Sequence, residues 1–184
     1  MISLQPGPQE ASLRPLLSQF QSSWYALQTL PRHEKAVVEH LQNENIDCLV
    51  PLTVRIHKWS DRNQSVSLPI FPGYAFVRLQ NYRHERIRVL RRPGVVRFVG
   101  NSQGAIALEE HEIEHIRQLM ENKIHCEPHP YLHAGQKVRI RNGALRGVEG
   151  ILLPESGKDR LVLSVSLIQR SLSIRIEGYD LEVV

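Results

Sequence analysis

The spacing of apolar residues changes along the chain and divides it into regions of different pattern. Between residues 23 and 122, stretches with the two-residue period of strands alternate with stretches of helical spacing. Between residues 133 and 184 only the two-residue alternation recurs, as in "QKVRIRNG" and "DRLVLSVSL". We predict an α+β domain over 23–122 and a small β-barrel over 133–184. A linker at 123–132 joins them, and residues 1–22 form a flexible polar tail.

The first region is predicted to hold several elements in a defined order. They are a strand at 24–29, a helix at 32–45 that Pro31 opens, a ribbon with arms at 48–59 and 65–70, a strand from Tyr74, a basic helix at 82–92, short strands around "NSQG", and a helix at 109–123. Proline suits a first helical turn, where its missing N–H has no partner to lose. Pro93 and Gly94 end the basic helix.

The stretch "LPIFPGYAFVRL", Leu68 to Leu79, places a rigid turn directly before an apolar strand. Phe71, Tyr74 and Phe76 lie there, although the chain has only 11 aromatic residues (Phe 4, Tyr 5, Trp 2) in total. Aromatic side chains at such a junction either pack in the core or form a docking surface, because rigid aromatic rings make good interface anchors. Both interpretations are open at this level.

Composition narrows the class of protein. The chain has 184 residues, of which 41% are hydrophobic and 23% charged, as in ordinary globular proteins. No apolar run is long enough for a transmembrane helix, and the N-terminus lacks the features of a secretory signal. Two cysteines, Cys48 and Cys126, argue against a disulfide framework and favour a cytoplasmic protein without a membrane association.

Charge is concentrated in one segment. The formal net charge is +4, but six arginines lie between Arg83 and Arg97 against the single acid Glu85. Such a basic face suits an anionic polymer, and it is equally compatible with a solvated helix face.

Several stretches together resemble one known family. "WYALQT", "FPGYAFVRL" and "GVVRFVG", followed by "GQKVRIRNGALRGVEGILL" and "LVLSVSLIQRSLSIRIE", are similar in order and spacing to the NusG family of transcription elongation factors. The resemblance covers Ser23 to Val184. It implies an N-terminal NGN domain, an antiparallel sheet flanked by helices, joined to a C-terminal KOW domain, a small SH3-like β-barrel.

Finer features resemble specialised paralogues such as RfaH and the antiterminators of polysaccharide operons. "NIDCLVPLTV" and the ribbon after it carry this likeness, and "NGALRGVEG" lacks the aromatics that housekeeping members usually carry in that loop. The chain departs from RfaH at Glu85, Arg86 and Ile87, where that paralogue has a polar histidine-threonine-threonine patch that grips the polymerase.

The resemblance implies a bacterial elongation or antitermination factor, cytoplasmic and monomeric, without catalysis, cofactor or metal. Its NGN domain would dock through an apolar cavity on the clamp helices of the largest catalytic subunit of RNA polymerase. The matching positions are Phe71, Tyr74, Phe76 and Phe98. Arg32, Lys58 and Arg62 are the residues expected to contact upstream or non-template DNA.

The KOW domain would recruit a partner, either a small-subunit ribosomal protein or the termination factor Rho. The expected surface consists of Leu145, Arg146, Val148 and Ile168. The strong two-residue alternation there predicts a stable barrel. A KOW-centred RNA- or ribosome-binding module is the alternative function.

Two histidine motifs suggest metal chemistry. "HEIEH", His111 to His115, matches the zinc-protease pattern H-E-x-x-H, but no third ligand follows at a known spacing. "HCEPHPYLH" holds three histidines and Cys126, whereas structural zinc sites usually take four well-spaced ligands. A plain helix and a plain linker are the simpler interpretations.

Overall fold

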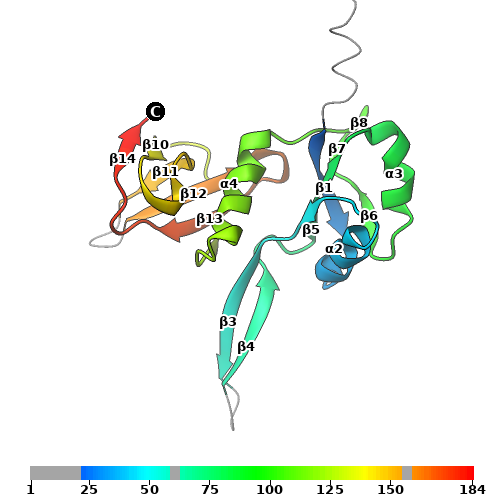
Figure 1. Ribbon diagram of the computed structural model, residues 1–184, viewed down its shortest axis with the longest axis horizontal. Helices are drawn as coiled ribbons and strands as arrows, with labels where there is room; N and C mark the ends of the chain where they lie inside the picture. The colour runs from blue at the N-terminus through cyan, green and yellow to red at the C-terminus, as the bar shows by residue number, and fades with distance from the viewer. Residues whose placement is uncertain (1–21, 59–62, 155–158) are drawn as a thin grey trace, which may run out of the picture.

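The computed structural model describes residues 22–58, 63–154 and 159–184, which form two antiparallel sheets and a projecting ribbon (Figure 1). The first sheet has the strand order β2-β5-β1-β6. Its strands are β2 (Cys48–Leu49), β5 (Tyr74–Leu79), β1 (Ser23–Thr29) and β6 (Val95–Phe98). The central pair, β1 and β5, runs in register from Ser23 opposite Leu79 to Gln28 opposite Tyr74. This sheet confirms the α+β fold of the first region.

Helices cover both faces of the first sheet. α2 (Glu34–Gln42) and α3 (Tyr82–Leu90) contribute to one buried cluster, and α4 (Glu110–Glu121) contributes to the other. Successive side chains of a strand point to opposite faces. Val77 of β5 therefore packs toward α2, whereas Phe76 packs on the side of α4. Because both faces are covered, the consecutive residues Ala75, Phe76 and Val77 of β5 are all fully buried.

The ribbon and one short hairpin complete the N-terminal region. β3 (Leu52–Lys58) pairs with β4 (Asn63–Pro69) through its whole length, as the sequence predicted. Figure 1 shows this ribbon extending away from the rest of the chain. β7 (Gly100–Asn101) and β8 (Gly104–Ala105) form a small hairpin after β6.

The second sheet has six strands in the order β14-β10-β11-β12-β13-β9. They are β9 (Glu127–His129), β10 (Gln136–Ile140), β11 (Glu149–Leu153), β12 (Arg160–Val165), β13 (Arg170–Arg175) and β14 (Leu181–Val183). Single 3-10 turns, η2 (Gly143–Leu145) and η3 (Ser166–Ile168), interrupt what the sequence predicted as strands and turns alone. At Gly150 a Cβ atom would lie 2.6 Å from the carbonyl oxygen of Val162, so only glycine lets these backbones approach.

The segment predicted as a linker contributes a strand. β9 lies within residues 123–132 and pairs with β13, with His129 opposite Ser171 and Glu127 opposite Ser173. Two prolines in "HCEPHPYLH" suggested irregular structure, but a strand at the edge of a sheet tolerates a residue without an N–H. Pro128 occupies such an edge position, so the sheet begins earlier in the chain than expected.

The two sheets share one hydrophobic core through α4. A single cluster of buried side chains extends from Trp24 and Phe76 of the first sheet, through Ile116 of α4, to Leu145 and Val165 beside the second sheet. The C-terminal domain is therefore packed against the N-terminal domain in this structure. None of the helices in the described ranges is long and apolar enough to cross a membrane.

Candidate functional site

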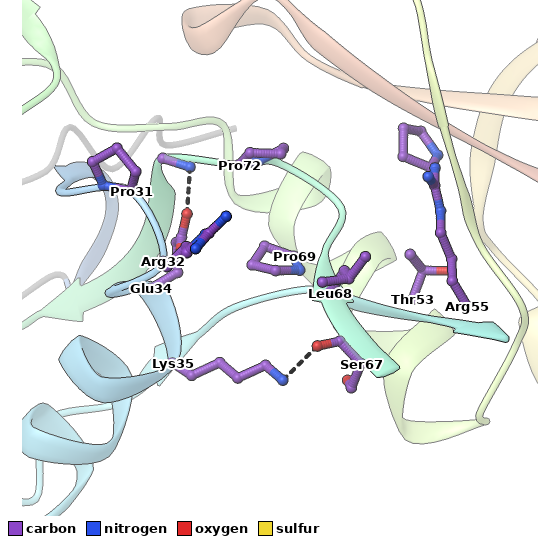
Figure 2. Close-up of a pocket in the computed structure, with 12 residues that line it drawn as sticks. Pro31, Arg32, Glu34, Lys35, Thr53, Arg55, Ser67, Leu68, Pro69 and Pro72 are labelled. Carbon is purple, nitrogen blue, oxygen red and sulfur yellow. Dashed lines mark hydrogen bonds between the residues drawn. The ribbon is translucent and has the colours of Figure 1, made fainter. Parts of the chain in front are cut away.

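A cavity of about 580 Å³ opens at the base of the ribbon, beside the Phe-Pro-Gly-Tyr turn (Figure 2). Its walls come from four places in the chain: the segment that leads into α2, the proximal parts of β3 and β4, the turn itself, and β9. The lining residues are Pro31, Arg32, Glu34, Lys35, Thr53, Arg55, Ser67, Leu68, Pro69, Pro72, Gly73 and Pro128. Elements distant in sequence thus meet around the motif that the sequence singled out.

The cavity combines rigid apolar walls with a cationic rim. Four proline rings and Leu68 supply the apolar surface, and a proline ring has almost no freedom to lose when a partner binds. Arg32, Lys35 and Arg55 are exposed around it. The Lys35 ammonium donates a hydrogen bond to the Ser67 carbonyl oxygen, which joins α2 to β4 (Figure 2). The rim therefore suits an acidic partner with an apolar projection.

Glu34 fixes the turn against α2. Its side chain is 3% exposed, and its Oε1 accepts a hydrogen bond from the Gly73 N–H at 2.7 Å (Figure 2). The Gly73 carbonyl oxygen in turn accepts from the Thr29 N–H at 2.9 Å. Gly73 has a φ of +82°, a conformation that favours glycine. The turn is thus held on both sides, and Pro72 is presented to the cavity in one arrangement.

Arg32 has an unusual backbone. Its φ is +66°, in the left-handed region that residues other than glycine, asparagine and aspartate rarely adopt. It follows Pro31 directly, and both line the cavity. A non-glycine residue held in this region is often found where function constrains the backbone.

The predicted docking aromatics Phe71 and Phe76 lie in the core and not on the surface. Phe71 is 1% exposed and Phe76 is fully buried, and their rings pack edge to face with centroids 6.0 Å apart. The reason is α4, which covers this face of β5. Neither ring is accessible to a partner in this arrangement. Tyr74 is only partly buried against the same cluster.

Phe98 does not join the other three aromatics. It is 8% exposed and belongs to the cluster on the opposite face of the first sheet. There its ring packs edge to face against Tyr25 and Tyr82, with centroids 6.0 Å and 5.2 Å away. The structure therefore brings together Phe71, Tyr74 and Phe76, while Phe98 belongs to a different part of the core.

The three residues expected to contact DNA are separated. Arg32 lines the cavity at the base of the ribbon. Lys58 is the last residue of β3 and pairs with Asn63. It lies six residues beyond Leu52 and is therefore about 20 Å from Leu52 along the ribbon. Arg62 lies outside the described residues.

The expected partner surface of the C-terminal domain is largely covered. Leu145 and Val148 are fully buried and Ile168 is 7% exposed, whereas Arg146 is exposed. In the docked arrangement seen here, three of the four residues expected to bind a partner are therefore covered, and their role in partner binding stays a prediction. These side chains fill the core that the C-terminal domain shares with α4.

Polar contacts along α4 hold the C-terminal domain in place. The Gln118 side-chain amide donates to the backbone oxygens of Ala144 at 2.9 Å and Arg146 at 3.3 Å. Six residues earlier on α4, Glu112 Oε1 accepts from the Ser166 N–H at 3.1 Å and from its hydroxyl at 2.7 Å. The seam is therefore both apolar and specifically hydrogen-bonded.

His115 lies between these two contacts. The Glu149 N–H donates to its Nδ1 at 3.5 Å. Burial, together with the neighbouring His111, lowers the pKa of His115, although Glu149 opposes this shift. The docked arrangement thus favours the neutral imidazole.

The two zinc hypotheses gain no support. The His111 and His115 rings are 5.9 Å apart, and Glu112 is engaged by Ser166. Among the residues that the structure describes, no three metal-ligating side chains lie close enough to hold an ion. Burial raises the pKa of Cys126 to about 12, which disfavours the thiolate that zinc requires.

Six residues that line the cavity were not singled out from the sequence: Glu34, Lys35, Thr53, Arg55, Ser67 and Pro128. Glu34 is the first residue of α2, a place where a carboxylate commonly serves a helix start. The helix begins there and not at residue 32 as predicted, because Arg32 has a φ of +66° and Pro31 lies in a turn before it. The hydrogen-bond partner of Glu34, Gly73, is remote in sequence. Arg55 could have been found from the alternation of the ribbon. Lys35 and Pro128 carry no such signal, because only the folded chain brings them to the cavity.

Two packed domains and a cavity with apolar walls and a cationic rim are features typical of a binding protein. Comparison with known proteins identifies the family. Residues 22–117 match the family described as "Transcription termination factor nusG", and the chain belongs to the NusG family. It is thus a transcription factor of the NusG type, a group without enzymatic activity.

Relatives match almost the whole chain. The transcription termination/antitermination protein NusG of Helicobacter pylori is 29% identical over 175 residues, which cover 88% of this chain and 98% of that protein. The protein of the same name from Lactococcus lactis is 26% identical over 178 residues, which cover 90% of this chain and 95% of that protein. A solved structure described as "Domain interaction in Thermotoga maritima NusG" has the same fold, with a TM-score of 0.51 at 18% identity, and covers 90% of this chain and 99% of that one.

Proposed function

We propose that this protein is a bacterial elongation or antitermination factor whose cavity beside the Phe-Pro-Gly-Tyr turn binds the clamp helices of the largest catalytic subunit of RNA polymerase. The observation that carries the proposal is the cavity itself, which is preformed, apolar-walled and built around the motif that the family shares. Its likeness to specialised antiterminators, rather than to housekeeping NusG, rests on the ribbon sequence and on the loop around Leu145.

The cavity suits a protein segment better than a small molecule. It opens to solvent at the base of an exposed ribbon, and three cationic side chains border it. An apolar side chain from a helix tip would fill the proline-lined wall, and acidic neighbours would pair with Arg32 and Arg55. Because the walls are rigid, ordering them on binding costs little free energy.

Binding at this site would act on transcription without chemistry. A factor that bridges the clamp stabilises the closed, processive polymerase and so suppresses pausing. Arg32, Lys58 and Arg62 would add phosphate contacts to upstream or non-template DNA, which position the protein without reading sequence. Tyr74, which is only partly buried beside the turn, would remain accessible to the partner, whereas Phe71 and Phe76 are buried.

Recruitment of a partner by the C-terminal domain would require a change of arrangement. Of the four residues proposed for that surface, three are buried in the seam with α4. A small-subunit ribosomal protein or Rho would therefore bind after the C-terminal domain has left α4. Polymerase binding near Pro128, which borders the cavity, would trigger this change because β9 belongs to the same sheet as the rest of the C-terminal domain.

The test is a pull-down of core RNA polymerase at physiological salt with Arg32→Glu/Arg55→Glu. We expect binding to weaken about tenfold or more, because two rim charges that face an acidic partner are reversed. Arg170→Glu/Arg175→Glu is the matched control, since both arginines are exposed on the C-terminal domain and the change in net charge is the same.

Housekeeping NusG should compete with the wild-type chain for the same site. Equal weakening by the test and control variants would contradict the cavity assignment. Tight binding of RNA by a chain that does not bind polymerase would favour the KOW-centred module instead. Substitution of Phe71 is unsuitable for this experiment, because a buried aromatic change destabilises the fold.

A further inference from the structure

A second cavity, of about 220 Å³, lies where α4 meets the second sheet. His111 and His115 of α4 line one side of it, and Lys137 of β10 and Ile151 of β11 line the other. Figure 1 shows α4 beside the second sheet, so the cavity takes its walls from both domains. Its volume is that of about seven water molecules, enough for a compact organic molecule. We call this cavity the seam pocket.

The buried part of the seam pocket is apolar, and its exposed part is polar. Ile151 and Leu163 line the pocket and are 7% and 4% exposed. His111, His133 and Lys137 also line the pocket, and all three are exposed. An apolar interior with a few convergent polar groups is the usual composition of a site for a small ligand.

The carboxylates and hydroxyls of the seam pocket are already engaged within the protein. Glu112 accepts from the N–H and the hydroxyl of Ser166. Glu149 pairs with Arg139 at 2.5 Å. The Ser164 hydroxyl donates to a backbone oxygen at 2.6 Å. A ligand would therefore meet few acceptor groups that still lack a donor.

The groups that remain uncommitted are chiefly donors. Across the part of the chain that the structure describes, no hydrogen bond or ion pair joins the side chain of His111, His133 or Lys137 to another residue. An ammonium group offers three donors, and each imidazole offers at least one N–H. Donors that converge from both domains, one of them cationic, suit the oxygens of a carboxylate.

The wall that carries His133 is fixed before any ligand binds. Its ring stacks on Tyr131 with centroids 5.8 Å apart. The intervening Leu132 is bonded to the sheet at both backbone groups. Its N–H donates to the Ser171 hydroxyl at 3.2 Å, and its carbonyl oxygen accepts from Ser164. Ordering this wall on binding would therefore cost little free energy.

We propose that the seam pocket binds a small organic carboxylate with a compact apolar body. The carboxylate would accept from Lys137 and from the imidazoles of His111 and His133, and the apolar body would cover Ile151 and Leu163. The charged contact selects an anion, and burial of the body supplies affinity. The residues of the seam pocket are different from those of the ribbon-base cavity, so this proposal stands without the polymerase site.

A ligand in the seam pocket would hold the two domains together. It contacts α4 and the second sheet at once, and that combination of walls exists only while the C-terminal domain is docked. A ligand that binds one of two states stabilises that state by mass action. The carboxylate would therefore oppose release of the C-terminal domain, a consequence that rests on the proposed function only where release serves partner recruitment.

A metal ion is the competing ligand, because His111 and His115 are one helical turn apart on α4. Among the described residues, however, no three metal-ligating side chains lie close enough to hold an ion. The buried part of the pocket also consists of hydrocarbon side chains, which do not bind a metal. Both observations favour an organic ligand.

The test is a titration of the ¹⁵N-labelled full chain with benzoate at neutral pH, followed by two-dimensional NMR. Benzoate is the probe because it joins one carboxylate to a compact ring. We expect saturable binding in the millimolar range, as for other ligands of this size, with shifts of amides on both α4 and β10. Benzamide, which has the same ring without the charge, should bind about fivefold or more weakly.

Variants of the pocket residues test the assignment. His133→Gln/Lys137→Gln should weaken benzoate binding about fivefold or more, and His111→Gln, on the other wall, about twofold or more. The matched control is His84→Gln/Arg170→Gln, which removes one imidazole and one positive charge from exposed positions outside the pocket and should bind like wild type. The same spectra show whether each variant is folded.

Equal binding of benzamide and benzoate, or an equal loss in the test and control variants, would overturn the proposal. Shifts confined to one domain would overturn it as well, because the ligand is proposed to contact both walls. Zinc binding that His111→Gln abolishes, in a chain that does not bind benzoate, would identify a metal site instead. Polymerase takes no part in these measurements, so failure here and failure of the cavity proposal are separate outcomes.

Discussion

At the scale of single residues, the cavity depends on a few backbone groups whose partners are distant in sequence. Glu34 joins the start of α2 to Gly73 in the turn before β5, and no other described side chain bonds the Gly73 N–H. The need for glycine in that turn was visible in the sequence, because "FPGY" places it between a proline and a strand. The carboxylate that fixes the turn was not visible, since proximity across 39 residues is a property of the fold.

Glu34→Ala should destabilise the protein and loosen the turn. Removing the acceptor leaves the Gly73 N–H unsatisfied in a partly buried place, which costs about 1–3 kcal/mol in the free energy of unfolding. Urea denaturation measures this cost. Glu34→Gln keeps an acceptor oxygen and should recover most of the loss, and Glu39→Ala, at an exposed position of the same helix, should change little. Equal costs for Glu34→Ala and Glu39→Ala would contradict the role of Glu34.

The burial of Phe71 and Phe76 shows what the pattern of apolar residues could not predict, which is whether one face of a strand is covered by another element. The two-residue period of β5 puts Tyr74 and Phe76 on one face of the sheet, but it does not say whether that face is open or covered. The answer depends on α4, more than thirty residues later, whose apolar stripe of Ile113, Ile116 and Leu119 covers it. Helical periodicity predicted that stripe well, and the pairing of stripe and sheet followed only from the structure.

At the scale of elements, α4 has two roles that its sequence pattern did not separate. Its buried side chains pack against the first sheet, and its polar side chains bond the C-terminal domain through Glu112, His115 and Gln118. The motif that resembled a zinc-protease helix is therefore a seam between domains. β9 is a second element whose role the sequence pattern did not reveal, because an edge strand with a proline is hard to distinguish from a linker by composition.

Docking of the C-terminal domain on α4 should weaken as the pH falls. Docking lowers the pKa of His115, so the undocked chain, with a histidine pKa of about 6.5, binds the proton more readily. The contribution of His115 to the free energy of docking is therefore fully present above a pH of about 6.5. It is progressively lost as the pH falls toward the lowered pKa of His115 in the docked state. His111 and Glu112 on α4 face the same region, as do Lys137, Arg139, Glu149 and His133 from the C-terminal side.

Small-angle scattering across this pH range measures the effect as an increase in the radius of gyration on acidification. His115→Gln removes the titrating group and should flatten the pH dependence, whereas His84→Gln, exposed on α3, should leave it as in wild type. An expansion of the same size and midpoint in His115→Gln would contradict the assignment to His115.

At the scale of the whole molecule, the order of motifs predicted the family and both folds. The NusG family match and the two sheets confirm that reading of the sequence. The packing of one domain on the other was not predictable, because each region has an apolar pattern that accounts for a core of its own. Leu145 and Val148 are apolar in the sequence whether they face a partner or α4.

The central claim is that the cavity at the ribbon base binds the polymerase. Site-specific photocrosslinking tests it most directly, with p-benzoylphenylalanine at Leu68, which lines the cavity, and at Ile106, which is exposed elsewhere on the N-terminal domain. The account predicts crosslinks from position 68 to the largest catalytic subunit of core polymerase and none from position 106. Crosslinks to that subunit from both positions alike, or from position 106 alone, would contradict it.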